Sequence, residues 1–262
     1  MAEFRKDKFY FANKQSRNPV KEDFRRHLHN EYELYYFLEG NSDYLVGDSV
    51  YRLRKNDLLL IRPSVYHFAK LNSDAPYHRI VINFPKEELP DPLLPALDEM
   101  QTYYNVPAES AIARAYKNAV CAIEQYSSEE DRYIALQGIL HFILLALKYE
   151  AQPQSGGATV VHPLLGEILR YVDENLEKPL DISSLAKTFF VSESWITHAF
   201  RNHLQISAMQ YINRKRILYA QQLIAGGTPP TEAAAKCAFE NYSTFYRQYK
   251  KYLNTPPKGG KN

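Results

Sequence analysis

The 262-residue sequence has few of the features that mark secreted or membrane-spanning proteins. It holds only two cysteines, Cys121 and Cys237, and both lie in apolar helical surroundings typical of buried thiols, which favours a reducing compartment without disulfides. No run of about 18 apolar residues appears, so a membrane-spanning helix is not expected. The start, from Met1 to Asp7, is too polar for a secretory signal. These absences predict a cytoplasmic protein that does not engage a membrane.

The sequence also lacks the motifs that are typical of catalytic sites. No glycine-rich phosphate loop is present, and the serines and cysteines form no convincing nucleophilic arrangement. We therefore expect neither catalytic residues nor a bound cofactor, and the sequence favours a binding protein over an enzyme.

The small net charge of +2 hides an asymmetry between the two ends of the chain. Residues 161–262 contain 13 Lys and Arg against 8 Asp and Glu, a balance of +5, whereas residues 1–160 have a balance of −3. The positive charge belongs to the C-terminal part, where a polyanionic partner such as DNA is expected.

Short apolar and aromatic segments between residues 24 and 84 predict β-strands. The segments are 33–39, 44–46, 49–53, 57–61 and 79–84. Gly47-Asp48 between the second and third predicts a tight hairpin turn. Strands at this spacing are typical of a small antiparallel barrel or sandwich.

Beyond Pro85 the apolar period changes from strand to helix. Residues 108–125 and 130–149 have apolar residues at helical spacing. Their apolar stripe is wide enough for a sheet on one side and a partner helix on the other. The segment 152–158, rich in Gly, Gln and Ser, is a flexible linker by composition. We therefore predict domains at 1–152 and 162–262, joined by a linker at 153–161.

The C-terminal domain contains one helix-turn-helix pattern twice. Leu185-Ala186 is matched by Ala233-Ala234 at an offset of 48 residues, and Phe200 is matched by Tyr249 at an offset of 49. A repeated helix pair with basic residues predicts two modules that read successive major grooves of DNA.

This half resembles the AraC/XylS family of bacterial transcription regulators over roughly 100 residues. Matches at the family's spacing include Leu185-Ala186, Tyr211-Ile212, Arg216-Ile217, Phe245 and Pro257. Some residues depart from the family pattern: Gln205, Pro230, Ala233, Ala238 and Asn254. Pro230 and Ala233 predict a shorter and less well packed first helix in the second module.

The N-terminal half resembles the cupin-type sensor domain attached to many such regulators. His27, His29, Glu33 and Gly40 match one cupin motif, and the Pro63 to His67 corner resembles part of the second. The resemblance implies an α+β fold of two domains. A cupin-like antiparallel β-barrel with following helices would precede an all-α domain, in which a long linker helix joins two helix-turn-helix motifs.

The two reading helices supply the candidate DNA contacts. In the first helix and its N-cap they are Ser192, Ser194, Trp195, Thr197, His198 and Arg201. In the second they are Asn241, Tyr242, Ser243, Tyr246, Arg247, Lys250 and Lys251. Arg247 is the best candidate for base reading, because its guanidinium group matches guanine with two hydrogen bonds. Trp195 suits partial core burial and stacking on the DNA backbone equally well, and Arg216 resembles a structural arginine that ties the linker helix to its neighbours.

The candidate effector-binding residues lie in the predicted barrel. They are His27, His29, Glu33, Tyr35, Tyr44 and His67. His27, His29 and Glu33 have the same parity, so on one strand they would share a face. Three readings stay open for the histidines: lining of an effector pocket, a structural role, and ligation of zinc, iron or manganese. We favour the first, without a bound metal.

These patterns predict a DNA-binding transcription regulator controlled by a small molecule, such as a sugar or related polar metabolite. The expected partners are double-stranded DNA, the effector, a second copy of the chain and, for an activator, RNA polymerase. Two alternatives remain: a metal-dependent cupin enzyme with a helical appendage, and an effector-independent DNA-binding protein. Activation and repression are both open.

Overall fold

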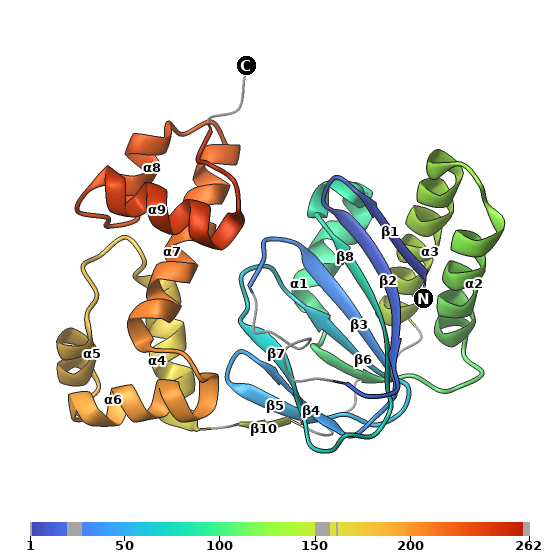
Figure 1. Ribbon diagram of the computed structural model, residues 1–262, viewed down its shortest axis with the longest axis horizontal. Helices are drawn as coiled ribbons and strands as arrows, with labels where there is room; N and C mark the ends of the chain where they lie inside the picture. Colours follow the sequence, from blue (N-terminus) through green and yellow to red (C-terminus); the bar gives the residue numbers. More distant parts are fainter. Residues whose placement is uncertain (1, 20–27, 150–157, 161, 259–262) are drawn as a thin grey trace. The chain divides into compact units, whose positions relative to one another are not determined.

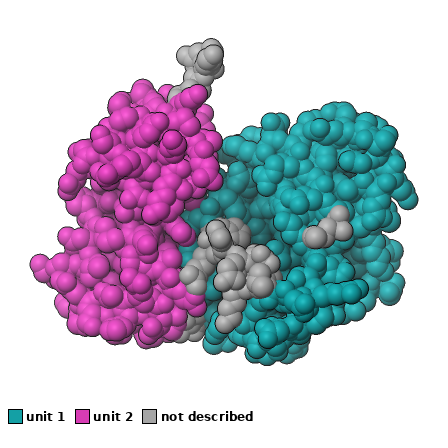
Figure 2. All heavy atoms as spheres, viewed as in Figure 1, with its two compact units in different colours: residues 1–159 teal, residues 160–262 magenta. Residues whose placement is uncertain are grey.

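The computed structural model describes residues 2–19, 28–149, 158–160 and 162–258. The chain divides into two compact units, Met1–Thr159 and Val160–Asn262, shown in different colours in Figure 2. No helix within the described ranges is long and apolar enough to cross a membrane.

Unit 1 is built on two antiparallel sheets (Figure 1). The larger sheet has the order β1-β2-β8-β3-β6-β9. Its strands are β1 (Ala2–Lys6), β2 (Phe9–Ser16), β3 (Tyr32–Glu39), β6 (Asp57–Ile61), β8 (Tyr77–Phe84) and β9 (Tyr103–Asn105). The smaller sheet has the order β10-β5-β4-β7. Its strands are β4 (Ser42–Val46), β5 (Ser49–Arg52), β7 (His67–Leu71) and β10 (Ala158–Val160).

The predicted strands are confirmed as β3, β4, β5, β6 and β8. The predicted hairpin turn is confirmed as well, because Val46 pairs with Ser49 and Gly47 has a φ of 60°. The sequence prediction missed β1, β2, β7, β9 and β10. Strands β1 and β7 have five residues each and β9 and β10 only three, while β2 is apolar only in its first half.

Side chains that alternate along β3 form two separate cores. Tyr35 and Phe37 pack with Tyr44, Tyr51 and other residues of both sheets, and this cluster fills the space between the sheets. Leu34 and Tyr36 belong to the other core, which joins the outer face of the larger sheet to the helices.

The helices of unit 1 follow the strands. They are the 3₁₀ turns η2 (Lys86–Glu88) and η3 (Asp91–Leu93), then α1 (Leu94–Glu99), α2 (Ala111–Gln125) and α3 (Glu129–Tyr149). Helices α2 and α3 lie side by side next to β1 (Figure 1). Ser110 caps α2 by accepting a hydrogen bond from the amide of Ala113. The two long helices therefore lie where the apolar spacing predicted them.

Unit 2 consists of helices in the described residues. They are α4 (Pro163–Glu174), α5 (Ile182–Thr188), α6 (Glu193–Ala199), the π-helical turn η4 (Phe200–Leu204), α7 (Ala208–Ala225), α8 (Pro230–Lys236) and α9 (Tyr242–Leu253). The first helix-turn-helix motif is α5 with α6 and η4, and the second is α8 with α9. Helix α7 joins them, and it ends at Gly226 as the sequence predicts.

The repeat is visible in the backbone as well as in the sequence. Phe190 and Ala238, 48 residues apart, both have positive φ in the turns, and Gln205 and Asn254, 49 residues apart, have positive φ at the ends of the reading helices. The one-residue change of offset comes from Glu240, which stands between the turn and the second reading helix.

One prediction for the second module is wrong. Helix α8 is not shorter than its counterpart α5, because both contain seven residues. Pro230 occupies the first helical position, where the missing amide hydrogen would have had no partner within the helix.

Candidate functional site

The first reading helix presents a polar face to solvent. Ser192 is its N-cap and accepts a hydrogen bond from the amide of Trp195 at 3.1 Å. Ile196 and Phe200 are fully buried and fix which side faces the core. The candidate contacts Ser194, Thr197, His198 and Arg201 are all exposed. The helical period thus places these four side chains on the open face, as predicted.

Trp195 has a mixed environment, in keeping with its ambiguous sequence context. Its side chain is half-buried, and its ring meets that of His162 edge-on with centroids 5.2 Å apart. His162 precedes α4, so the indole links the reading helix to the start of unit 2. Part of the side chain remains exposed.

The second reading helix is built on the same plan. Asn241 is its N-cap and accepts a hydrogen bond from the amide of Thr244 at 2.8 Å. Phe245 and Tyr249 are buried. The candidate contacts on this helix are exposed: Tyr242, Ser243, Tyr246, Arg247, Lys250 and Lys251. Arg247 keeps its guanidinium group at the surface, with a 3.5 Å hydrogen bond to the Thr244 hydroxyl on the same helix.

Two basic residues of α7 have structural roles. Arg216 is buried and donates hydrogen bonds to the carbonyls of Leu176 at 3.1 Å and Lys178 at 2.6 Å. Lys215 is also buried and forms an ion pair with Asp173 at 2.7 Å. The structural interpretation of Arg216 is therefore confirmed.

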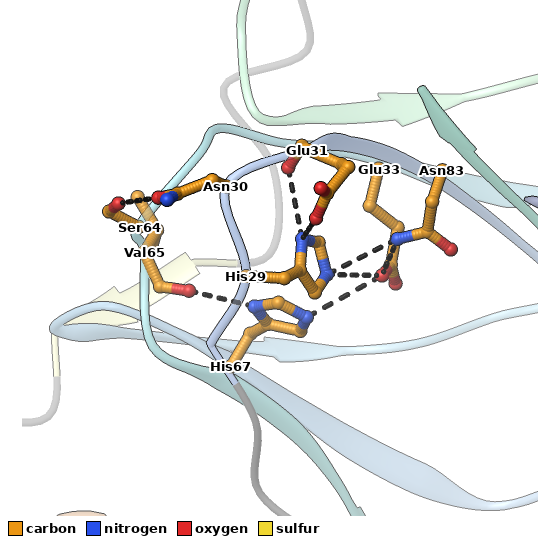
Figure 3. Close-up of polar contacts among 8 residues, drawn as sticks. All are labelled: His29, Asn30, Glu31, Glu33, Ser64, Val65, His67 and Asn83. Atoms are coloured by element: carbon orange, nitrogen blue, oxygen red, sulfur yellow. Dashed lines mark hydrogen bonds and ion pairs between the residues drawn. The ribbon is translucent and has the colours of Figure 1, made fainter. Parts of the chain in front are cut away.

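In unit 1, three other candidate effector residues, His29, Tyr44 and His67, meet around the carboxylate of Glu33. Figure 3 shows the two histidines beside Glu33. Nε2 of His29 lies 3.1 Å from Oε2 of Glu33, and Nε2 of His67 lies 3.5 Å from the same oxygen. The hydroxyl of Tyr44 donates to Oε1 of Glu33 at 3.4 Å. Side chains predicted from separate sequence motifs thus form one cluster.

Asn83 completes this cluster, and the sequence did not predict it. Its amide nitrogen donates to Oε2 of Glu33 at 2.9 Å and lies 3.2 Å from Nε2 of His29. Glu33 on β3 pairs directly with Asn83 on β8, so the register of the sheet brings the two side chains together. That register joins strands 50 residues apart, and no local pattern reveals it.

The charge of Glu33 alters the ionisation of its neighbours. Burial by itself lowers the pKa of His29, but the hydrogen bond and negative charge of Glu33, helped by Glu31, outweigh burial and raise the pKa above 6.5. Burial raises the pKa of Tyr44 well above 10, and the charge of Glu33 adds to the shift. Tyr44 therefore stays protonated and can act as a hydrogen-bond donor.

The two remaining candidates have different outcomes. Tyr35 is buried beside Tyr44, with ring centroids 4.4 Å apart, but its hydroxyl pairs with that of Tyr77. His27 lies outside the described residues. The prediction that His29 and Glu33 share one face of a strand is wrong, because His29 precedes β3. The two side chains still meet, since the chain before the strand turns the His29 ring toward Glu33.

His29, Glu33 and His67 are also chemically suited to hold a metal ion. One ligand atom from each lies within 4.8 Å of the others. Nδ1 of His29 lies 3.0 Å from the Glu31 carbonyl and Nδ1 of His67 lies 2.8 Å from the Val65 carbonyl. If these nitrogens carry the protons, both Nε2 atoms present a lone pair toward Glu33, and two imidazoles with one carboxylate suit zinc, iron or manganese.

Two family models match the chain. A model described as an AraC-like ligand binding domain matches residues 15–139, and one described as a helix-turn-helix domain matches residues 185–259. The first match covers most of unit 1, including β3 and β8, and the second begins in α5 and runs past α9.

Curated relatives include regulators from several bacteria. The HTH-type transcriptional activator RhaR of Cronobacter sakazakii is 24% identical over 229 residues, which are 85% of this chain and 81% of that protein. The transcriptional regulatory protein HptR of Staphylococcus aureus is 31% identical over 93 residues, which are 36% of this chain and 37% of that protein. Among solved structures, ToxT of Vibrio cholerae is 14% identical and covers 96% of both chains, with a TM-score of 0.39.

Proposed function

The chain belongs to the AraC/XylS family of transcription regulators, with an AraC-like ligand-binding domain and a helix-turn-helix DNA-binding domain, and on this basis we propose how its two units act. Helices α6 and α9 read successive major grooves of double-stranded DNA. A small polar molecule, such as a sugar, binds beside Glu33 and controls that reading.

The observation that carries the DNA proposal is the equivalence of the two reading helices. Each begins at a polar N-cap and has an exposed polar face. The opposite side is buried and includes the matched aromatic residues, Phe200 in the first module and Tyr249 in the second. The exposed amides at such helix starts attract phosphate groups, and side chains of the first turns reach base edges. Two such faces in one chain favour two adjacent contact regions on DNA.

The two faces differ in chemistry. In α9, Arg247 can donate two hydrogen bonds to a guanine, and Lys250 and Lys251 suit phosphate contacts. In α6 the residue that corresponds to Arg247 at the offset of 49 is His198, whose imidazole makes fewer donors available. We therefore expect the second module to supply the stronger base preference.

The test compares Arg247→Ala with Lys250→Ala on a set of DNA sites that differ at single base pairs. Loss of Arg247 should cost roughly 1–3 kcal/mol on the preferred site and relax the preference at one position. Loss of Lys250 should weaken binding to all sites alike and reduce the dependence of affinity on salt, because one phosphate contact disappears. Binding is measured by fluorescence anisotropy at several salt concentrations.

Lys236→Ala is the matched control. Lys236 lies on α8 rather than on a reading helix, and its charge is already paired with Glu232 at the surface, so its loss should leave the salt dependence unchanged. An equal loss of affinity on every site for Arg247→Ala would make that residue a backbone contact, and an unchanged affinity would contradict the reading-helix assignment.

The Glu33 cluster supports the effector proposal. It combines a buried carboxylate that accepts hydrogen bonds with amide, imidazole and phenol groups that donate them. Such a mixture recognises hydroxyl groups, which both donate and accept. His29 and Glu31 are only partly buried, so a ligand can approach from their side of the cluster.

The distances within His29, Glu33 and His67 favour one alternative, a metal-dependent enzyme. Metal analysis of the purified protein distinguishes the two proposals. Stoichiometric zinc, iron or manganese that is lost in His29→Ala would replace the effector proposal, whereas metal-free protein that binds a sugar at Glu33 supports it.

We further propose that a second copy of the chain docks on α3. Its exposed apolar side chains, Ile134, Phe142 and Leu145, follow one another at helical spacing. Gly138 lies between them, and a Cβ there would meet nothing within 4 Å, so a partner helix can approach closely. Such a face can pair with itself about a twofold axis.

The other proposed partners are DNA and, for an activator, RNA polymerase, with the cytoplasm as the expected compartment.

A further inference from the structure

Away from the Glu33 cluster, unit 1 contains a pocket of about 990 Å³ between the larger sheet and α2. Its walls include Tyr36 of β3, Ile80 of β8, and Tyr116 and Val120 of α2. Tyr36 and Glu33 are three residues apart on β3 and point to opposite faces of the sheet. The pocket is therefore separate from the proposed effector site.

Tyr116 is one of the residues that line this pocket, and its hydroxyl is an unused hydrogen-bonding group. Its side chain is fully buried and its ring stacks on that of Tyr36, with centroids 4.4 Å apart and planes 13° from parallel. The Tyr36 hydroxyl donates to Asn56, but the Tyr116 hydroxyl has no partner among the described residues. A buried hydroxyl without a partner is destabilising, and a ligand oxygen beside it would remove that cost.

A second polar group lies on the opposite wall. His78 of β8 and Asn13 of β2 line the pocket and are joined through Nε2 and Oδ1 at 2.6 Å. Burial lowers the pKa of His78 below 6.5, so the imidazole is neutral near pH 7. This wall offers polar atoms without a net charge.

The exposed rim also has no excess of charge. Lys55 and Lys117 are balanced by Glu39 and Glu109. Deeper in, aromatic and aliphatic side chains predominate, with few polar groups between them. A pocket of this composition suits a largely apolar, uncharged ligand with one or two hydroxyl groups better than a sugar, which needs a partner for each of its many hydroxyls.

A β-bulge lies in the wall of the pocket. The pairing of β3 with β8 shifts between Phe37, which faces Arg79, and Glu39, which faces His78. Bulges bend a strand locally and are frequent beside binding sites. The bulge contributes Phe37, Leu38 and Glu39 to the pocket wall.

We propose that this pocket is a second small-molecule site, which takes a neutral aromatic compound with a hydroxyl group. The aromatic body packs on Ile80, Val120 and the Tyr36–Tyr116 pair, and its hydroxyl oxygen accepts a hydrogen bond from the Tyr116 hydroxyl. The site does not depend on DNA binding or on the effector at Glu33.

The test uses the full-length protein and 2-naphthol, which is fluorescent and neutral at pH 7. We expect saturable binding of one 2-naphthol per chain. Tyr116→Phe should weaken 2-naphthol roughly fivefold, the effect of one lost hydrogen bond, and leave binding of naphthalene unchanged. Because that variant removes only a hydroxyl without a partner, its thermal stability should be equal to or above that of the original protein.

Two further measurements keep the proposal open to contradiction. Val120→Trp fills the pocket from its half-buried rim and should abolish 2-naphthol binding without unfolding, as checked by circular dichroism. Glu33→Gln should leave 2-naphthol binding unchanged, whereas it should remove binding of a sugar. Absence of saturable 2-naphthol binding, equal weakening of naphthol and naphthalene by Tyr116→Phe, or loss of 2-naphthol in Glu33→Gln would each overturn the second site. Loss of sugar binding alone would bear only on the proposed effector site.

Discussion

Single buried polar residues fall into two groups in this protein. Arg216 and Lys215 satisfy carbonyls and a carboxylate of unit 2 and hold α7 in place. Glu33 instead contacts side chains of the proposed effector site, and one neighbour, His29, is partly open to solvent. Burial alone does not separate the groups, since Arg216 and Glu33 are buried to nearly the same degree. The partners decide which residue is structural and which can bind.

Glu33→Gln should remove the response of the protein to a sugar effector. The neutral amide keeps the size of the side chain but replaces one of the two acceptor oxygens with a donor NH2 group and removes the charge, so it binds hydroxyl hydrogens at fewer positions and more weakly. In a thermal shift assay with neutral pentoses and hexoses, a ligand at 100 times its Kd stabilises the original protein by about 2.7 kcal/mol. The variant should show no such rise in melting temperature.

Glu124→Gln is the control, because Glu124 is exposed on α2 and lies outside both proposed sites. An undiminished thermal shift in Glu33→Gln would place the effector elsewhere.

At the scale of elements, the sequence predicts segments with a clear apolar period and misses contacts that depend on register. The long helices α2 and α3 follow from repeated apolar spacing, and the exposed face of α9 follows from Phe245 and Tyr249. Strand β1 has only five residues and alternates with charged ones, and β2 is apolar only in its first half, so neither was predicted. Asn83 was missed for a different reason, since only the pairing of β3 with β8 places it beside Glu33.

The two helix-turn-helix modules should differ in local stability. Helix α5 begins with a capping box between Asp181 and Ser184, whereas the N-cap of α8, Pro229, makes no side-chain cap bond within the described residues. Leu185 and its counterpart Ala233 are both fully buried, and the larger side chain stabilises by about 2 kcal/mol more. Amides of α8 and α9 should therefore exchange hydrogen several-fold faster than those of α5 and α6. Stronger protection in the second module, measured by native-state exchange and mass spectrometry, would contradict this.

Helix α3 should control the oligomeric state. Phe142 is 45% exposed on the apolar face, and a charge there would have to be buried against the second copy. Phe142→Glu should raise the dimer dissociation constant at least tenfold, about 1.4 kcal/mol, as measured by light scattering after size-exclusion chromatography. Tyr126→Glu is the matched control, because Tyr126 is equally exposed, at 45%, but lies beyond the end of α2. Equal effects of the two changes would indicate a general effect of charge, and no effect of either would place the dimer contact elsewhere.

At the scale of the whole molecule, regulation requires that the effector bind two arrangements of the protein with different affinity. Unit 1 offers two routes to such a difference. The Glu33 cluster lies between the sheets, while the second pocket has α2 as a wall, and α2 packs along the α3 helix proposed for dimerisation. A ligand in the second pocket would therefore act on the proposed dimer, and the proposed effector at Glu33 would act through the sheets.

The proposal that two helix-turn-helix modules of one chain read DNA leads to a prediction about the spacing of their DNA sites. Helix α7 has 18 residues, so its axis is about 27 Å long, and successive major grooves on one face of DNA are about 34 Å apart. A continuous helix cannot stretch to a more distant groove. Inserting five base pairs between the two contacted blocks turns the second block to the opposite face and should lower affinity by roughly 100-fold, because only one module then binds.

An insertion of ten base pairs separates this arrangement from a flexible one. It restores the face of the second block but adds a full turn of distance, which α7 cannot span, so affinity should stay low. Recovery of affinity would mean that the two blocks are bound by different chains of a dimer, or by two modules whose connection is flexible. Arg247→Ala provides the internal control. Its second module already binds DNA weakly, so this variant should lose less affinity on either insertion. Gel-shift titrations on the three DNA spacings, with both proteins, measure all of these differences.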